Sequence, residues 1–172
     1  MNELSLFTGA GGGLLASKYM LGFKTVGYVE FEGYPQRVLQ QRIKDGFLDY
    51  APIYGDIRAF IDYGYAKAYQ GMVDVVTGGF PCQPHSVAGK GLGADDPRDM
   101  WPATCRVIGI TRPKKAFLEN VAGLISSGYI GNVLKDLSEI GYDAKWQTLS
   151  AKEVGACHKR ERLWLLAYPR VW

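Results

Sequence analysis

Short apolar segments alternate with amphipathic segments along most of the chain, and this alternation predicts strands and helices in turn. Continuous apolar or β-branched runs predict buried strands, whereas apolar residues three and four positions apart predict helices. We expect strands at residues 4–7, 25–29, 53–54, 73–77, 116–118, 144–149 and 163–167. We expect helices at residues 14–21, 35–45, 100–110 and 130–140.

Strands and helices that alternate on this scale predict an α/β fold, in which a mostly parallel sheet carries helices on both faces. The last two strands are joined by a charged segment and form a closing pair. The sequence contains no internal repeat, low-complexity tract or linker, so we expect a single domain over residues 1–172. Ligands of such sheets bind at the carboxyl ends of the strands, which directs attention to the residues that follow each strand.

A glycine-rich segment follows the first predicted strand. Glycines at positions 9, 11, 12 and 13 would let the backbone approach a ligand closely. Leu14 occupies the third glycine position of the dinucleotide pattern, which favours a compact nucleoside ligand over a pyrophosphate. Glu30 ends the next strand and is placed for a ribose diol, and Asp56 could accept a bond from an exocyclic amine. The alternative is a tight turn without a ligand, accompanied by two solvated carboxylates.

Two further strand ends carry groups suited to catalysis. Cys82 lies between Pro81 and Gln83-Pro84, where a rigidly held and partly exposed thiol could act as a nucleophile once activated. Glu119 ends the neighbouring strand and could donate a proton in the same crevice. The alternatives are a small core cysteine and a carboxylate that caps the strand end.

Arginines precede the last strand. Arg160 and Arg162 are two residues apart and would share one face, with Lys159 and Glu161 on the other. The alternative is a charged turn at an edge strand. Residues 80–99 form a segment without periodicity that contains Gly89, Gly91 and Gly93, and segments of this length in compact domains are usually functional or disordered.

Composition excludes several classes of protein. The chain has 172 residues, of which 47% are hydrophobic and 22% are charged, so collagen, coiled-coil and disordered classes are excluded. No apolar run approaches the ~18 residues that a membrane helix needs, and Met1–Phe7 lacks the basic start of a signal peptide. Three cysteines without a CxxC pair argue against a disulfide framework or a zinc site and suit a reducing compartment.

The net charge of +3 is unevenly placed, with −1 on residues 1–80 and +4 on residues 81–172. A basic second half permits a polyanionic partner, although a small excess of this kind also fits ordinary surface solvation.

Four motifs at predicted strand ends together resemble the DNA cytosine-5 methyltransferase family. They occur in order as Phe7-Thr8-Gly9-Ala10-Gly11-Gly12, Pro81-Cys82-Gln83-Pro84, Glu119-Asn120-Val121 and Arg160-x-Arg162. The resemblance extends from Leu4 to about Ala167. It implies a Rossmann-like, S-adenosylmethionine-dependent methyltransferase fold, with a mostly parallel seven-stranded sheet that ends in an antiparallel hairpin.

The resemblance also implies a reaction and its residues. A methyl group would pass from S-adenosylmethionine to C5 of a cytosine in DNA, after a thiolate has added to C6 of a flipped-out base. The implied catalytic residues are Cys82, Glu119, Arg160 and Arg162. The implied cofactor-binding residues are Phe7, Gly9, Gly11, Gly12, Glu30, Asp56, Ile57 and Pro81. The segment 83–98 would close over the base, and its implied nucleic-acid contacts are Gln83, Ser86, Lys90 and Arg98.

The sequence departs from the family pattern at three points. His158 stands where the family usually has Gln, and His85 stands where it usually has Phe. The family also continues with a target-recognition region and a final helix, whereas this chain stops at Trp172. The alternatives are a catalytic fragment, one half of a split enzyme, and a short form that reads DNA with another device. We expect DNA as a partner, a second chain that supplies those parts if the enzyme is split, and exposed apolar surface around Leu14 and Leu15.

Other functions stay open at this point. They are a tRNA cytosine-5 methyltransferase of the same fold, and an inactive or split-enzyme fragment that binds cofactor or nucleic acid without turnover. A nicotinamide oxidoreductase is disfavoured by Leu14 and by the Pro-Cys-Gln segment. We expect no metal ion and no membrane, and a place in the cytoplasm of a prokaryotic or phage-infected cell.

Overall fold

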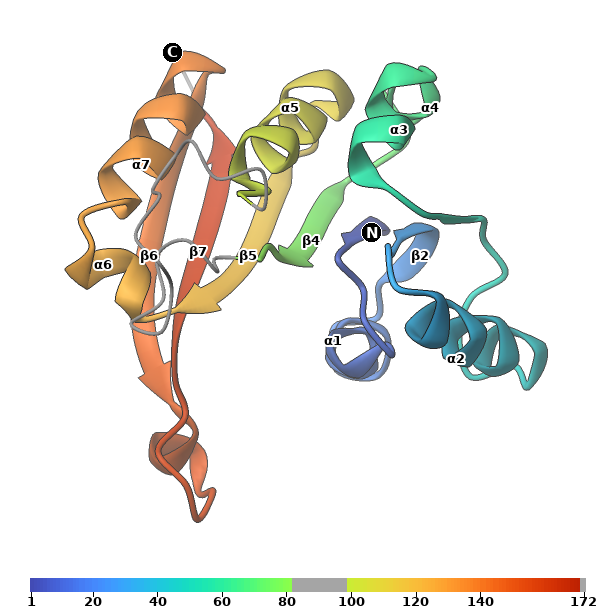
Figure 1. Ribbon diagram of the computed structural model, residues 1–172, viewed down its shortest axis with the longest axis horizontal. Coiled ribbons are helices and arrows are strands. Elements are labelled where there is room, and N and C mark those ends of the chain that lie inside the picture. Colours follow the sequence, from blue (N-terminus) through green and yellow to red (C-terminus); the bar gives the residue numbers. More distant parts are fainter. Residues whose placement is uncertain (82–98, 171–172) are drawn as a thin grey trace.

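The computed structural model describes residues 1–81 and 99–170. Its central element is a twisted sheet of seven strands. The strand order is β3-β2-β1-β4-β5-β7-β6 (Figure 1). Strands β1 to β5 pair in parallel, and β7 runs antiparallel to both β5 and β6. The strands are β1 (Asn2–Leu6), β2 (Lys24–Val29), β3 (Ile53–Tyr54), β4 (Val75–Gly79), β5 (Lys115–Val121), β6 (Tyr142–Ser150) and β7 (Glu161–Pro169). The predicted mostly parallel sheet with an antiparallel closing pair is confirmed.

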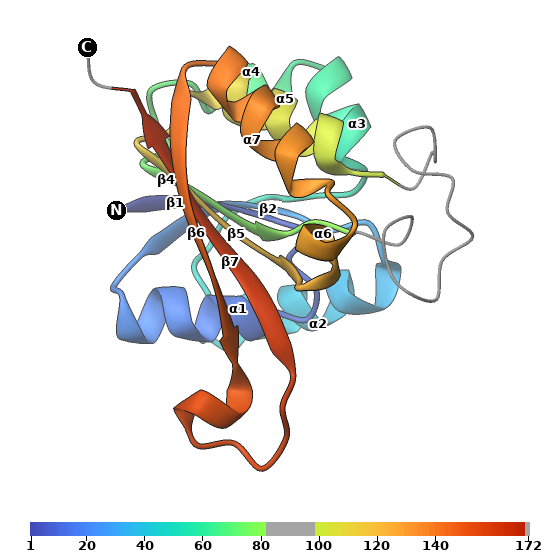
Figure 2. The ribbon, with the colours of Figure 1, turned by 90° about the vertical axis from the view of Figure 1, so that its left-hand side faces the viewer.

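Helices lie on both faces of the sheet, and all four predicted helices are present. The helices are α1 (Gly12–Leu15), α2 (Gly33–Lys44), α3 (Ile57–Asp62), α4 (Tyr65–Ala68), α5 (Trp101–Thr111), α6 (Gly123–Ser126) and α7 (Ile130–Glu139). Helix α1 continues into a π-helical turn at Ala16–Met20. Figure 2 shows α3, α4, α5 and α7 on one face, with α1 and α2 on the other. The short helices α3, α4 and α6 were not among the predictions.

The burial of β5 and β7 shows that their two faces have different surroundings. Ala116, Leu118 and Asn120 of β5 are buried on the face that carries α5 and α7, whereas Phe117, between them, is 37% exposed. The same alternation continues in β7, where Leu163, Leu165 and Ala167 are buried and their neighbours Arg162, Trp164 and Leu166 are only partly buried. In the part of the chain that the structure describes, no helix covers this second face of β5 and β7.

The predicted limits of β4 were wrong by two residues. The strand runs from Val75 to Gly79 rather than from Val73 to Thr77, because the glycines continue the pairing with β5. A Cβ atom at Gly78 would lie 2.9 Å from the carbonyl oxygen of Leu6 in β1. Glycine is therefore needed here for the close approach of two strands, and it does not end the strand.

Leu14 and Leu15 differ in burial. The expectation that both are exposed was wrong for Leu14, which is buried against Tyr28, Leu39 and Leu48 beneath β2. Leu15 is 56% exposed. Successive residues of a helix point in directions about 100° apart, so one of them faces the sheet and the other faces solvent.

Candidate functional site

A cavity of about 780 Å³ lies against the uncovered face of β4, β5 and β7. One wall is the chain from α1 through the π-helical turn to Phe23, and the other wall is the β6–β7 hairpin. The cavity extends to Phe7 and Thr8, which follow β1, and to Gly78 and Gly79 at the carboxyl end of β4. The cavity lining includes Glu3, Phe7, Gly78, Gly79, Phe117, Glu119, Trp146, Leu149, Arg160, Arg162 and Trp164.

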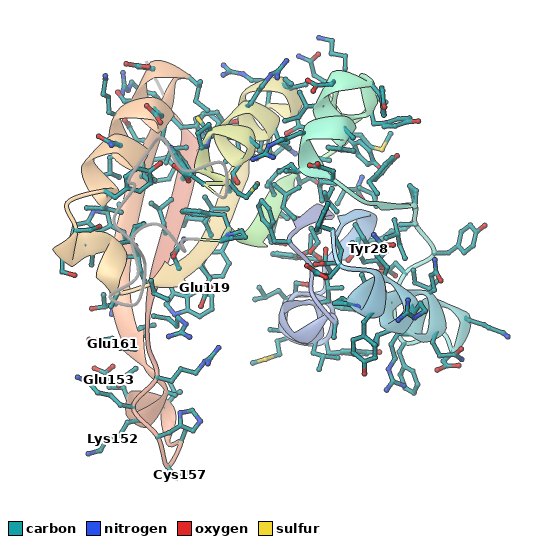
Figure 3. All side chains as sticks on the ribbon, viewed as in Figure 1. Tyr28, Glu119, Lys152, Glu153, Cys157 and Glu161 are labelled. Carbon is teal, nitrogen blue, oxygen red and sulfur yellow. The ribbon has the colours of Figure 1, made fainter. Side chains whose placement is uncertain are left out.

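Glu119 and Arg162 form an ion pair at this cavity. The Nε atom of Arg162 lies 2.8 Å from Oε1 of Glu119, and both side chains are partly buried. Val121 of β5 is paired with Arg162 of β7, so Glu119 and Arg162 are diagonal neighbours on the same face of an antiparallel pair. Figure 3 shows Glu119 toward the carboxyl end of β5. The arginine therefore holds the carboxylate in one orientation at the edge where β4 and β5 end.

Arg160 also lines the cavity, so it shares a side with Arg162 as predicted. Lys159 and Glu161 pair with each other, with Nζ 3.7 Å from Oε2. Arg160 has a φ of 30°, which is rare for a residue with a side chain. Phe7, another cavity residue, has a φ of 50°. Backbone conformations of this kind cost on the order of 1–3 kcal/mol each and often occur at functional sites.

Glu30 joins the turn after β1 to the end of β2. Its Oε2 atom accepts the N–H of Gly9 at 2.6 Å, and its Oε1 atom accepts the N–H of Glu32 at 2.8 Å. The residue is 7% exposed. Each carboxylate oxygen retains a lone pair for another donor. Glu30 thus shapes the glycine turn, a role in addition to the one predicted from the sequence.

Asp56 begins helix α3. Its Oδ1 atom accepts the N–H of Arg58 at 2.8 Å, which is the bond of an N-cap residue. Ile57, the next residue, is buried in the core. The cavity lining includes Phe7 but none of the other expected cofactor residues, which are Gly9, Gly11, Gly12, Glu30, Asp56, Ile57 and Pro81. Those residues follow or end the strands β1 to β4 at the carboxyl edge of the sheet.

Cys82 and the expected nucleic-acid residues Gln83, Ser86, Lys90 and Arg98 lie outside the described residues. Phe80 and Pro81, which lead to Cys82, lie within the described residues. The buried Asn120 donates from Nδ2 to the carbonyl oxygen of Phe80 at 3.0 Å, and its Oδ1 accepts the N–H of Val121 at 2.8 Å. The strand end that carries Glu119 is thus bonded to the residue two positions before Cys82.

Sequence reasoning missed Glu3, a buried carboxylate that contributes to the cavity wall. It is 1% exposed and accepts three hydroxyl groups, from Ser17 at 2.9 Å, Thr25 at 2.9 Å and Thr77 at 2.7 Å. The available signal was the alternation of Glu3 and Ser5 with Leu4 and Leu6, which gives β1 a polar face. The stacked rings of Phe117 and Trp164, with centroids 5.3 Å apart, were also missed.

Residues 1–81 and 99–170 contain no group of three or more side chains that could hold a metal ion. Within the same residues, no helix has the length and apolar character required to cross a bilayer.

Comparison with known sequences identifies relatives over almost the whole chain. The chain is 34% identical over 168 residues to the Type II methyltransferase M.NgoMIV of Neisseria gonorrhoeae. This match covers 96% of this chain and 51% of the relative. It is 31% identical over 166 residues to M.CviJI of Paramecium bursaria Chlorella virus IL3A, covering 95% of this chain and 42% of the relative. The chain therefore spans about half the length of the curated relatives it matches.

Solved structures share the fold. The Dnmt2 methyltransferase of S. pombe superposes with a TM-score of 0.75 at 19% identity, over 100% of this chain and 50% of that one. A putative DNA modification methyltransferase from an E. coli prophage superposes with a TM-score of 0.70 at 24% identity, over 98% of this chain and 47% of that one. These likenesses confirm the predicted methyltransferase fold. The model of the C-5 cytosine-specific DNA methylase family matches residues 1–170, and the chain belongs to that family.

Proposed function

We propose that this chain transfers a methyl group from S-adenosylmethionine to C5 of cytosine in DNA, through a covalent adduct of Cys82 with a flipped-out base. The observation that carries the proposal is the Glu119–Arg162 pair, which faces the cavity at the edge where β4 and β5 end. Asn120 ties this edge to Phe80, two residues before Cys82. The Cys82 thiol, the Glu119 carboxyl group and the Arg162 guanidinium would then act on the same cytosine.

The proposed roles follow from the chemistry of cytosine. C5 is a poor nucleophile, and addition of the Cys82 thiolate to C6 places electron density on it. That addition requires the charge on the ring to be neutralised, so Glu119 protonates or hydrogen-bonds N3 while Arg162 holds O2 and orients Glu119. After methylation, a base removes the C5 proton and Cys82 leaves by elimination, which restores the ring and the free enzyme.

The residues around β1 and β2 fit S-adenosylmethionine, which supplies an electrophilic methyl group when bound. Added Cβ atoms at Gly9 and Gly12 would meet nothing within 4 Å, so the backbone is open to a ligand there. The Glu30 carboxylate can accept ribose hydroxyls with its remaining lone pairs. Phe7 would pack against the adenine, Gly9 and Gly12 would admit the methionine part, and Asp56, Ile57 and Pro81 would complete the site. The expected role of Gly11 is different, because an added Cβ there would lie 3.4 Å from Leu39 and its φ is 89°, so this glycine serves the turn and its packing.

DNA and a second polypeptide are the proposed partners. The tip of the β6–β7 hairpin carries Lys152, His158, Lys159 and Arg160 together with one acid, Glu153, all exposed, so positive charge is in excess there. Figure 3 shows Lys152 at this tip, beyond the body of the sheet. Such a basic projection suits phosphate groups. The apolar cavity wall, with Phe117, Trp146 and Leu149 partly exposed, suits a segment that covers the sheet. An enzyme acting on DNA in a prokaryotic or phage-infected cell would work in the cytoplasm.

Transfer of a tritiated methyl group to mixed-sequence DNA and to tRNA tests the proposed function. We expect labelled DNA and unlabelled tRNA, with weak and unspecific transfer by the 172-residue chain alone and stronger transfer when a neighbouring gene product is added. Label found in tRNA alone would show that tRNA, and not DNA, is the substrate. Absence of label from both, with or without the second product, would favour a fragment that binds without turnover.

Asp56→Asn is expected to weaken the binding of S-adenosylhomocysteine by about 1.5–3 kcal/mol, the usual loss for a charge-assisted hydrogen bond. Asparagine caps helices as well as aspartate does, so the free energy of unfolding should stay unchanged. Asp56→Ala should lose affinity and also about 1 kcal/mol of stability, because the bond to Arg58 N–H disappears. Calorimetry and chemical denaturation separate the two effects. Unchanged affinity in Asp56→Asn would remove this carboxylate from the cofactor site.

A further inference from the structure

Buried residues hold both ends of the segment that contains Cys82. At the leading end, Phe80 is buried and its carbonyl oxygen accepts the bond from Asn120. At the trailing end, Asp99 and Trp101 are buried. The rings of Phe80 and Trp101 contact each other, with centroids 5.3 Å apart and planes inclined by 50°. The two ends therefore meet in the core, and whatever fixes one of them also affects the other.

Asp99 is a buried carboxylate whose two oxygens have separate donors. Its Oδ1 atom accepts the N–H of Trp101 at 3.0 Å and so satisfies the first turn of α5, where the side chain of Met100 makes no capping bond. Its Oδ2 atom accepts the hydroxyl group of Tyr129, which is itself buried. Hydrogen bonds to an ionised acceptor are among the stronger ones, and a buried carboxylate is costly without them.

Tyr129 lies at the start of α7, so its bond to Asp99 joins the first turn of α5 to that helix. A second bond joins the same two helices, because Nε1 of Trp101 donates to Oδ2 of Asp136 at 2.7 Å. Tyr129 and Asp136 are seven residues apart, which is about two helical turns. Two attachment points at this separation fix both the position and the direction of the start of α5.

On the basis of the function proposed above, we propose that Tyr129 is a positioning residue for methyl transfer, which acts through Asp99 and the contact of Trp101 with Phe80 on the strand end that leads to Cys82. Tyr129 does not line the cavity that Glu119 and Arg162 share, and it lies before α7, away from the ends of β1 to β4 to which the cofactor residues are assigned. Loss of its hydroxyl group should therefore leave the binding of cofactor intact while it displaces the attacking group. A displacement of about 1 Å from the reactive geometry can cost about 100-fold in rate.

Tyr129→Phe and a matched control, Tyr142→Phe, test the proposal in the full-length protein. Tyr142 is also buried, and its hydroxyl group donates to the carbonyl oxygen of Pro113 at 2.6 Å, at the opposite end of the sheet from Cys82. Both variants should unfold at a similarly lowered temperature. We expect Tyr129→Phe alone to lower kcat, by on the order of 10- to 100-fold, with the KM for S-adenosylmethionine within about twofold of that of the unsubstituted protein.

A double substitution separates the bond from the tyrosine ring. If Tyr129 acts through Asp99, then Tyr129→Phe combined with Asp99→Ala should lower kcat no more than Asp99→Ala does alone. Losses that multiply would show that the two residues act independently and would overturn the proposal.

Alkylation of Cys82 requires no enzyme turnover, so its rate tests the role of Tyr129 even if the proposed methyl transfer does not occur. The rate at which a thiol reagent alkylates Cys82 is measured in a Cys157→Ser background, because Cys157 is exposed. Burial raises the pKa of the Cys105 thiol to about 12, so this residue does not compete. Tyr129→Phe should change the alkylation rate, and Tyr142→Phe should not. If the unsubstituted protein methylates nothing, the proposed function fails and the alkylation rates alone decide the inference. Equal effects of both substitutions would overturn it.

Discussion

Cys82→Ala is expected to abolish the covalent complex with DNA that contains 5-fluorocytosine and to lower methyl transfer by about 10⁴-fold or more. Fluorine at C5 cannot leave as a proton does, so the adduct between the thiolate and C6 accumulates once methylation has occurred. Alanine offers no nucleophile to form that adduct. A denaturing gel measures the complex, and incorporation of tritiated methyl groups measures the reaction.

Cys157→Ala is the matched control for this experiment. Cys157 is exposed near the tip of the β6–β7 hairpin, away from Glu119 (Figure 3). The control should form as much complex as the unsubstituted protein. Both measurements are made with DNA and with any partner chain that the reaction requires. A complex that persists in Cys82→Ala would show that another residue attacks the base.

Glu119→Gln is expected to lower methyl transfer by about 10²- to 10⁴-fold, the range typical of the loss of a general acid. The amide has nearly the shape of the carboxyl group and can still accept the bond from Nε of Arg162, which spans 2.8 Å in the parent. It cannot deliver a proton to N3. The affinity for S-adenosylhomocysteine, measured by calorimetry, should stay within about twofold, because no cofactor contact is assigned to Glu119.

Glu139→Gln provides a control in which the same chemical change is made on the surface. Glu139 lies at the end of α7 and pairs with Lys135 across 3.7 Å, with both side chains largely exposed. Exposed pairs of this kind contribute about 0.2–1 kcal/mol, so activity and stability should hardly change. A Glu119→Gln protein that loses cofactor affinity, yet reacts normally once loaded, would contradict the assigned role.

Much of the architecture was predictable because it depends on local pattern. The apolar face of α7 buries Val133 and Leu137, as its spacing predicts, and Gly141 follows with a φ of 83°. Motifs at strand ends predicted where the site lies, because parallel strands bring their carboxyl ends to one edge. Asp56 shows the limit of this reasoning, since an aspartate before an apolar segment signals a helix start as much as a ligand.

The remaining features depend on contacts between distant parts of the chain. A shift of one residue in the pairing of β5 with β7 would place Arg162 on the other face of the sheet, away from Glu119, and sequence alone does not set this register. Glu3 collects hydroxyl groups from residues 17, 25 and 77, which no local pattern connects. Helices α3 and α4, with six and four residues, are too short to show a helical period.

The five residues of β4 have a consequence for the order in which the chain folds. Strands β1 to β3 pair within residues 2–54, and β5 to β7 pair within residues 115–169, so each set can assemble from nearby sequence. Among the strands of residues 1–81 and 99–170, only β4 joins the two sets, through Glu3 paired with Val75 on one side and Val75 paired with Lys115 on the other. Closing these long loops costs entropy before the pairing stabilises the chain. We therefore expect the docking of β4, rather than the formation of either set of strands, to limit the rate of folding.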